Sequence, residues 1–365
     1  MLSINIKPAL RNSWVMVFLL LAQHVMAQQP EANTWYFGRF LGLDFNSGTA
    51  VPLNDGKLNT TEGVASISDN TGKILFYTEG MNIWNRNHQL MPNGTGLLGH
   101  ESSTQSAVVV PFINDPLRYY VFTVDFQGHA NGLRYSVVNM SLAGGNGDVE
   151  AKNMPLLSNV VEKITAVKHC NNRDVWVVAH GFGSDAYYSF LVTAAGINST
   201  PVISNTGANL PATDSATLGY MKASPDGSKI AAAHLNVSAD ISDFNNGTGV
   251  VSNTFNIFLP SERYYIPYGI EFSQDSRLLY TTVFYTDPAN GVKRNALLQY
   301  DVTLGSPAAI SASKQLIAQN SDPIQSFAAL QMAPDGKMYM AKNTYNHIAC
   351  INSPNTYGTG CGFVS

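Results

Sequence analysis

Apolar and polar positions along this chain follow a pattern that occurs six times. Each copy holds a short apolar strand, a tight polar turn, a charged residue and a second apolar strand. The six turns centre on Asp69, Asp115, Asn171, Asp226, Asp275 and Asp335. Their mean separation of about 53 residues matches one four-stranded sheet with its loops. The pattern therefore predicts a repeat protein assembled from hairpins.

The turn sequences explain why each copy forms a hairpin. In Pro225-Asp226-Gly227 the proline presets φ, the Asp side chain bonds nearby backbone, and glycine accommodates positive φ. The strands that follow the turns, such as residues 74–78 and 175–179, are apolar at successive positions and so on both faces. Such a strand must lie between two layers, as it does where sheets pack radially. We therefore predict an all-β fold, a β-propeller whose hairpins are similar to those of WD40 and TolB propellers.

The number of blades follows from the strands that the six hairpins leave over. Residues 35–38 and 42–45 also have the character of strands. Seven blades is the preferred count, with six and eight as the alternatives. Strands from the two ends of the chain could share one blade, which closes the ring and removes free edges. The residues 361–365 predict the beginning of another strand, so we expect the propeller domain, residues 28–365, to be a C-terminally truncated part of a longer protein.

Residues 1–27 have the features of an export signal peptide. Lys7 and Arg11 precede an apolar run at residues 14–22, and Ala27 ends a small-residue cleavage site. The run is shorter than the roughly 20 residues that cross a bilayer, so no membrane span is predicted. The expected location is extracellular or on the outer cell surface, after export through the periplasm.

The charge of the mature chain argues against one class of partner. The sequence has 21 Lys and Arg residues, and without Lys7 and Arg11 it has 19 against 25 Asp and Glu, a formal net charge of −6. Phosphate backbones bind to basic surfaces, so nucleic acid is not expected as a partner.

Three cysteines are too few for a disulfide-built scaffold. Cys350 and Cys361 enclose a short Pro- and Gly-containing loop and could pair in an oxidising compartment, with two free thiols as the equal alternative. Cys170 lies beside His169, but a buried thiol at a strand end is the preferred interpretation over a nucleophile.

Aligning the hairpins places one residue of each copy at the end of its second strand. These positions hold Glu79, Asp125, His180, His234, Val283 and Lys342. If the hairpins are the inner strands of the blades, these residues meet on one rim, together with Glu62, Gln105 and Glu162. They are candidate binding residues, while an ordinary polar rim is the simpler interpretation. Metal binding or acid–base chemistry is the less favoured alternative, and no catalytic residue, metal or other cofactor is assigned.

Five segments carry a resemblance to a known family: residues 33–45, 62–80, 83–106, 162–181 and 351–361. They resemble the N-terminal propeller region of large surface proteins of gliding bacteria, described as gliding-motility-associated or as cargo of the type IX secretion system. The resemblance implies an extracellular protein that continues into immunoglobulin-like repeats and a C-terminal sorting domain read by the type IX machinery. It implies no catalytic residues.

Three functions of different classes remain open. The first is a non-catalytic binding or adhesion module for an extracellular glycan or protein, favoured by the aromatic and amide residues of loops such as residues 84–88. The alternative is an extracellular polysaccharide hydrolase or lyase that uses the polar ring of Glu79, Asp125, His180 and His234. A purely architectural spacer is the third choice.

Overall fold

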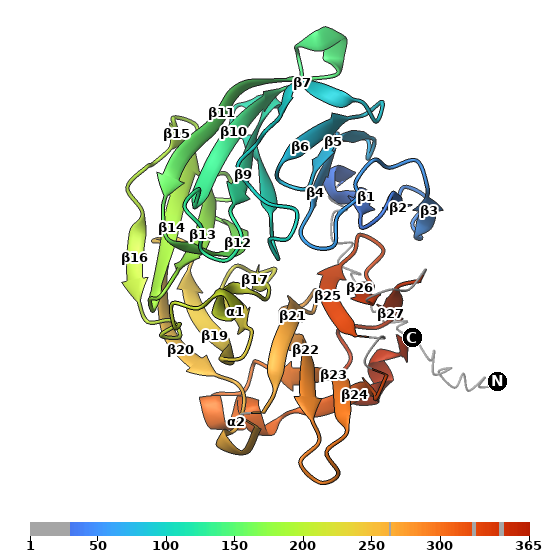
Figure 1. Cartoon of the computed structure of the whole chain (residues 1–365), viewed down its shortest axis with the longest axis vertical. Helices are drawn as coiled ribbons and strands as arrows, with labels where there is room; N and C mark the ends of the chain where they lie inside the picture. Colours follow the sequence, from blue (N-terminus) through green and yellow to red (C-terminus); the bar gives the residue numbers. More distant parts are fainter. Residues whose placement is uncertain (1–29, 263, 323–325, 343–346) are drawn as a thin grey trace, which may run out of the picture.

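The computed structural model describes residues 30–262, 264–322, 326–342 and 347–365. In these residues, seven small antiparallel sheets stand around one axis (Figure 1). The predicted all-β propeller and its preferred count of seven blades are confirmed. The predicted signal peptide, residues 1–27, lies outside the described residues.

The blades follow one another in chain order. The first blade consists of β1 (Thr34–Phe37), β2 (Leu41–Asp44) and β3 (Val51–Leu53). The second consists of β4 (Ala65–Ser68), β5 (Ile74–Thr78), β6 (Asn82–Asn85) and β7 (Leu90–Thr95). The third consists of β8 (Ala107–Phe112), β9 (Asp115–Val124), β10 (Leu133–Asn139) and β11 (Asp148–Leu157).

The remaining blades have four or five strands each. The fourth consists of β12 (Val160–Lys168), β13 (Val175–Gly181) and β14 (Ala186–Thr193), with β15 (Gly196–Ile197) and β16 (Val202–Asn205) both paired to β14. The fifth consists of β17 (Met221–Ala223), β18 (Lys229–His234), β19 (Ser238–Asn245) and β20 (Val250–Asn256). The sixth consists of β21 (Ile266–Phe272), β22 (Leu278–Thr286), β23 (Lys293–Asp301) and β24 (Gln315–Asn320). The seventh consists of β25 (Phe327–Met332), β26 (Met338–Lys342), β27 (Ala349–Ile351) and β28 (Phe363–Val364).

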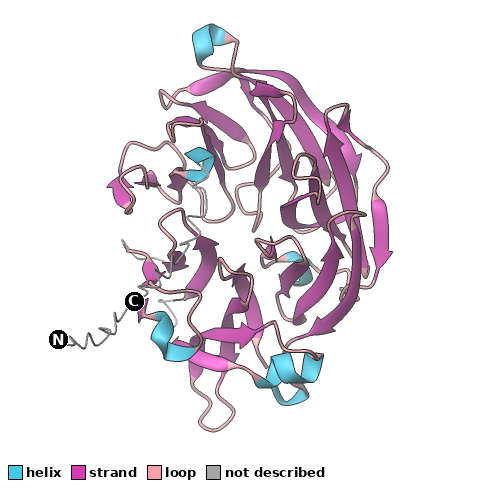
Figure 2. Cartoon of the chain, turned by 180° about the vertical axis from the view of Figure 1, so that it is seen from behind, coloured by secondary structure: helices cyan, strands magenta, loops and turns pink. Residues whose placement is uncertain are grey.

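Helices are few and short in the described part of the chain (Figure 2). They are α1 (Asp214–Thr217), α2 (Pro307–Ala312), and the 3-10 turns η1 (Pro30–Ala32), η2 (Ala143–Gly145), η3 (Pro260–Glu262) and η4 (Gly358–Cys361). No described helix has the length and apolar character needed to cross a membrane.

The six predicted hairpins are the two innermost strands of the second to seventh blades. Asp226 shows how their turns are held: its Oδ1 accepts hydrogen bonds from the Ser228 N–H at 3.0 Å and the Ser224 hydroxyl at 2.6 Å. Gly227 takes a φ of +69° in the same turn. All six Asp or Asn turns lie at one rim of the ring, which we call the turn rim. The opposite rim, where each hairpin begins and ends, is the loop rim.

Both faces of the second strands are buried, as their apolar sequences predict. Phe122 of β9 packs in one cluster with Ile164 of β12 and Val177 of β13, which joins the third blade to the fourth. Val178 and Trp176 of β13 belong to another cluster, with Ile230 of β18 in the fifth blade. A single strand thus supplies apolar surface to the blades on either side of it.

The ring does not close by the expected route, in which strands from the two ends of the chain share one blade. Among the described residues, the first blade has strands only from the start of the chain and the seventh only from its end. Side chains close the gap instead: Leu43 and Phe45 of the first blade pack on Ala333 and Tyr339 of the seventh.

The structure bears on both cysteine interpretations, and for Cys350 and Cys361 it favours the alternative of two free thiols. Cys350 and Cys361 are free thiols, so the disulfide considered for them is absent. Ala349 and Ile351 of β27 face the same core as Cys361. Because side chains alternate along a strand, Cys350 points to the other face of the sheet. Cys170 is exposed in its turn, not buried at a strand end.

The apolar contacts between blades predict a large contrast between two leucines on adjacent strands. Leu297 of β23 is completely buried, whereas Leu316 of β24 is 47% exposed. We expect Leu297→Ala to lower the free energy of unfolding by about 2–5 kcal/mol and Leu316→Ala by about 0.5 kcal/mol or less. Urea denaturation of both variants measures this. Equal losses would contradict the assignment of the core.

Candidate functional site

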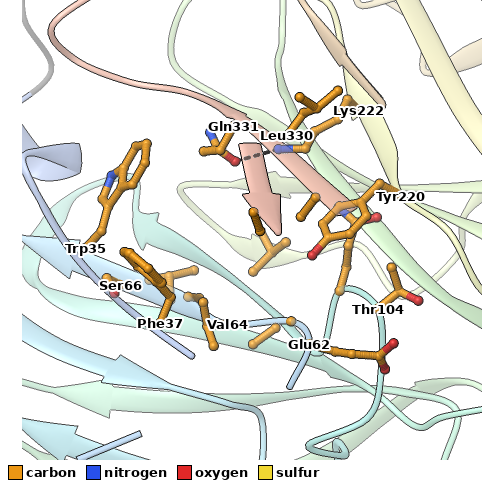
Figure 3. Close-up of a pocket in the computed structure, with 18 of the residues that line it drawn as sticks. Trp35, Phe37, Glu62, Val64, Ser66, Thr104, Tyr220, Lys222, Leu330 and Gln331 are labelled. Carbon is orange, nitrogen blue, oxygen red and sulfur yellow. Dashed lines mark hydrogen bonds between the residues drawn. The ribbon is translucent and has the colours of Figure 1, made fainter. Parts of the chain in front are cut away.

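A channel of about 830 Å³ follows the axis of the ring. All seven blades contribute to its wall, and Figure 3 shows several of these side chains. Trp35 and Phe37 of β1 lie on one side, and Tyr220 and Glu62 lie on another. The volume is within the range of about 300–1,000 Å³ that is typical of small-molecule sites.

Glu62, Tyr220 and Tyr268 form a polar and aromatic group at the loop rim of the channel. Glu62 precedes β4, and its Oε1 accepts a hydrogen bond from the Tyr268 hydroxyl at 3.0 Å. Its Oε2 accepts a second one from the Ser102 hydroxyl at 3.2 Å. The Tyr220 and Tyr268 rings meet edge to face, with their centroids 5.7 Å apart. We call these three residues the Glu62 group.

Burial changes the protonation of this group. Loss of water raises the pKa of Glu62 to about 7, and the nearby charge of Glu162 adds to the rise. The hydrogen bonds from Tyr268 and Ser102 act in the opposite direction but do not overcome burial. Near neutral pH this carboxyl is therefore shared between a form that can donate a hydrogen bond and one that only accepts.

Glu162 lies behind the channel wall and joins neighbouring segments. It is completely buried. Its Oε2 accepts a hydrogen bond from the Thr104 N–H at 2.7 Å, and its Oε1 accepts one from the Thr217 hydroxyl at 2.9 Å. Burial raises the pKa of Glu162 as well. This residue fixes the loops that carry the channel wall and does not itself line the channel.

Gln105 lines the channel, but its amide is already engaged. The side-chain nitrogen donates to the Met221 carbonyl at 3.0 Å, and the side-chain oxygen accepts from the Met221 N–H at 2.7 Å. Further along the channel, Lys222 donates to a Glu271 carboxylate oxygen at 2.9 Å and to the Gln331 side-chain oxygen at 2.6 Å (Figure 3). Both sets of bonds tie one inner strand to another.

A second polar cluster is buried between the fourth and fifth blades. Lys163 is completely buried and donates hydrogen bonds to the carbonyls of Leu218 at 3.0 Å and Ala233 at 2.8 Å. Burial lowers the pKa of Lys163 to about 7. The His180 and His234 rings lie 5.3 Å apart, and burial lowers the pKa of His180 to about 4 and that of His234 well below its usual value. Both imidazoles are therefore neutral at pH 7.

The residues predicted at the ends of the second strands do not line the channel. Each is at most 8% exposed: Glu79, Asp125, His180, His234 and Lys342. The second strand lies one layer outside the channel wall, so its end is covered by neighbouring blades and loops. Of these five, His180 and His234 contact each other.

The other three bond locally. Asn82 donates to the Glu79 carboxylate at 2.7 Å. Asp125 accepts hydrogen bonds from the backbone N–H groups of Phe126 and Asn131. Lys342 donates to the Ser365 hydroxyl at 2.6 Å. Of the eight candidate residues, Glu62 and Gln105 line the channel.

Tyr220 and Tyr268 were not among the predicted residues. Tyr220 directly precedes the first strand of the fifth blade and Tyr268 lies near the start of the first strand of the sixth, while Glu62 and Gln105 shortly precede those of the second and third. Aligning the starts of the repeats, in addition to their ends, would have found them. Within the described residues, no group of three or more His, Cys, Asp or Glu side chains is arranged to hold a metal ion.

Comparison with known proteins reveals similarity only among solved structures. No family model and no curated protein matches the chain. A protein of Bacteroides uniformis assigned as a 6-phosphogluconolactonase is 13% identical, with a TM-score of 0.49 over 85% of this chain and 86% of its own. Hydrazine synthase of Kuenenia stuttgartiensis is 11% identical, with a TM-score of 0.44 over 78% and 72%. An exo-β-1,3-galactanase of Phanerochaete chrysosporium is 12% identical, with a TM-score of 0.40 over 72% and 66%. We assign neither activity nor ligand from similarities at this level.

The raised pKa of Glu62 predicts a pH-dependent contribution to stability. Between the usual pKa of a Glu side chain, 4.5, and about 7, the folded protein holds a proton that the unfolded chain has lost. The contribution of Glu62 is therefore greatest below pH 4.5 and decreases as the pH rises towards 7. We expect Glu62→Gln to remove this decrease, as measured by urea denaturation at pH 5 and pH 7.5.

Tyr268→Phe supplies the matched variant. Its missing hydroxyl removes a hydrogen bond that lowers the pKa of Glu62, so the decrease in stability should extend to higher pH. Identical pH dependence in the native protein and in Glu62→Gln would refute the assignment to Glu62.

Proposed function

We propose that this chain is a non-catalytic binding module of an exported surface protein, and that its channel binds an extracellular glycan. The observation that carries the proposal is the Glu62 group, where two tyrosine rings and a carboxyl converge on the open volume at the loop rim. Neither tyrosine is completely buried, so both rings are available to a ligand in the channel.

The chemistry of the Glu62 group suits a sugar. Sugar hydroxyls need both hydrogen-bond donors and acceptors, and a carboxyl with a pKa of about 7 supplies both near neutral pH. The aromatic rings of Tyr220 and Tyr268 offer apolar surface to the C–H faces of a sugar ring and hydroxyl groups to its edge. Rigid aromatic side chains also lose little conformational entropy on binding.

The setting of this module is proposed from the sequence. The export signal at residues 1–27 and the five segments similar to gliding-motility-associated proteins support a type IX secretion cargo displayed at the cell surface. In such a protein a further C-terminal domain would engage the secretion machinery. N-terminal sequencing of the exported protein tests the signal, with Gln28 as the expected first residue.

Binding should depend on the rings of the Glu62 group. Among immobilised oligosaccharides, we expect at least one to bind the native protein, and Tyr220→Ala to weaken that binding tenfold or more, about 1.4 kcal/mol. Tyr357→Ala is the matched control, because Tyr357 is 44% exposed and does not line the channel. Calorimetric titration with the bound oligosaccharide measures the difference. Equal affinity of all three proteins would place the glycan elsewhere.

A polysaccharide hydrolase or lyase is the second candidate, and Glu62 is the observation that favours it. A carboxyl with a pKa of about 7 facing a channel is suited to act as a general acid or base. The ring of Glu79, Asp125, His180 and His234 lies outside the channel, so an enzyme would use Glu62 in its place.

Product analysis separates the two candidates. If the protein is a hydrolase or lyase, oligosaccharides incubated with it are shortened, and Glu62→Gln slows the reaction at least about 100-fold. Mass spectrometry detects both changes. Oligosaccharides that bind to the native protein and remain intact support the binding module.

A further inference from the structure

The Glu62 carboxyl accepts its hydrogen bonds from neutral groups. Its Oε1 accepts from the Tyr268 hydroxyl at 3.0 Å, and its Oε2 accepts from the Ser102 hydroxyl at 3.2 Å. In the part of the chain that the structure describes, no Lys, Arg or His side chain forms an ion pair with Glu62. A carboxyl group therefore faces the channel without a cation of the protein to balance its charge.

The lysines of this region are engaged elsewhere. Lys222, which lines the channel, donates to a Glu271 carboxylate oxygen at 2.9 Å. Lys163 donates to backbone carbonyls between the fourth and fifth blades. Lys168, the other lysine in the channel wall, ends β12 at the turn rim, whereas Glu62 lies at the loop rim. A cation that balances Glu62 would therefore have to come from a ligand.

Two features of the site oppose the negative charge of Glu62. Burial removes water from the carboxyl, and the charge of Glu162 repels it, so that the pKa of Glu62 rises to about 7. A bound cation would reduce both effects, because it replaces the lost water with an opposite charge and offsets the repulsion from Glu162. A neutral sugar hydroxyl supplies no such charge. The site therefore favours a positively charged group over a hydroxyl.

The two tyrosine rings favour the same kind of group. The rings of Tyr220 and Tyr268 meet edge to face, with centroids 5.7 Å apart, and both are half-buried in the channel wall. An ammonium group within about 6 Å of the centre of such a ring is attracted to its face by about 0.5–2 kcal/mol. Aromatic faces combined with a carboxyl group therefore suit an ammonium ion.

The hydrogen-bonding capacity of Glu62 also fits an ammonium group. An ionised carboxylate has about four lone-pair positions, and the hydroxyls of Tyr268 and Ser102 occupy two of them. An ammonium group carries three N–H donors and no acceptor, so it can use both remaining positions. On another side of the channel, Trp35 and Phe37 offer apolar surface to neighbouring sugar units (Figure 3).

We propose that the ligand of the Glu62 group is an amino sugar, whose free amine binds as an ammonium ion between the Glu62 carboxylate and the rings of Tyr220 and Tyr268. This inference rests on the proposed function, a glycan bound in the channel, and specifies the sugar. Acetylation of the amine removes its charge and leaves a single N–H donor. An N-acetylated sugar with the same skeleton should therefore bind more weakly.

The test compares two oligosaccharides of equal length and linkage, a tetramer of β-1,4-linked glucosamine and its fully N-acetylated form. Calorimetric titration at pH 7 should show about tenfold or more tighter binding of the glucosamine tetramer. Glu62→Gln should remove this preference. Glu101→Gln is the matched control and should retain it, because Glu101 directly precedes Ser102 but is exposed and does not line the channel.

A second measurement reports the contact itself. The carboxyl carbon signal of Glu62, followed by NMR against pH, should show a lower pKa in the presence of saturating glucosamine tetramer, because an opposite charge favours the ionised form. The N-acetylated tetramer should leave this pKa unchanged or raise it. Binding of the glucosamine tetramer without a lower pKa of Glu62 would place the amine elsewhere and overturn the proposal.

The remaining outcomes separate this proposal from the function on which it rests. Equal affinity for the two tetramers overturns the amino sugar and leaves glycan binding intact, and so does binding of other oligosaccharides but of neither tetramer. Tri-lysine that binds as tightly as the glucosamine tetramer also overturns it, since charge alone would then suffice. If no oligosaccharide binds at all, the proposed function itself is wrong.

Discussion

Burial of both faces of the second strand in each repeat is the constraint on which this structure depends. Strands such as β5 and β13 have apolar side chains at successive positions, so one wet face would expose half of them. A neighbouring blade on each side removes that exposure, and only a closed ring gives every blade two neighbours. The turns, the axis and the channel follow from this arrangement.

The same burial determines the electrostatics of the molecule. Loss of water is the largest cause of the shifted pKa values of Glu62, Lys163 and His180. Its consequences differ with position. Lys163 is enclosed between blades and satisfied by backbone carbonyls, so it serves the structure. Glu62 lies where the inner strands leave an open volume, so its altered chemistry is available to a ligand.

Among the described residues, the first blade closes the ring by side-chain packing and not by a strand shared between the two ends of the chain. Its strands pack well on both neighbours through Tyr36 and Tyr77 on one side and Phe45 and Tyr339 on the other. In the part of the chain that the structure describes, these contacts close the ring, and β1 pairs only with β2. Beside the first blade the channel is therefore lined by aromatic and aliphatic side chains such as Trp35 and Leu43.

Much of the fold could be predicted from the sequence, because its determinants are local. Apolar runs and Pro-Asp-Gly turns act within a single hairpin, and together with the regular spacing of the copies they predicted the hairpins and the preferred count of seven blades. Less of the candidate site could be predicted from the sequence. Glu62 was identified from its place at the start of the first hairpin and Gln105 from its polar segment, but Tyr220 and Tyr268 meet Glu62 only through packing between blades.

The tertiary structure alone decided which polar residues face the channel. Glu79 and His180 were candidate rim residues because each ends a second strand. The repeat pattern does not show how far a strand end lies from the axis, and both residues are buried outside the channel. Cys350 and Cys361 were separated in the same way, because the side-chain alternation of β27 turned one thiol away from the other. The sequence by itself determined the repeating unit, through short-range turn chemistry and apolar periodicity. Packing between blades determined exposure and protonation, since these depend on contacts between residues far apart in the chain.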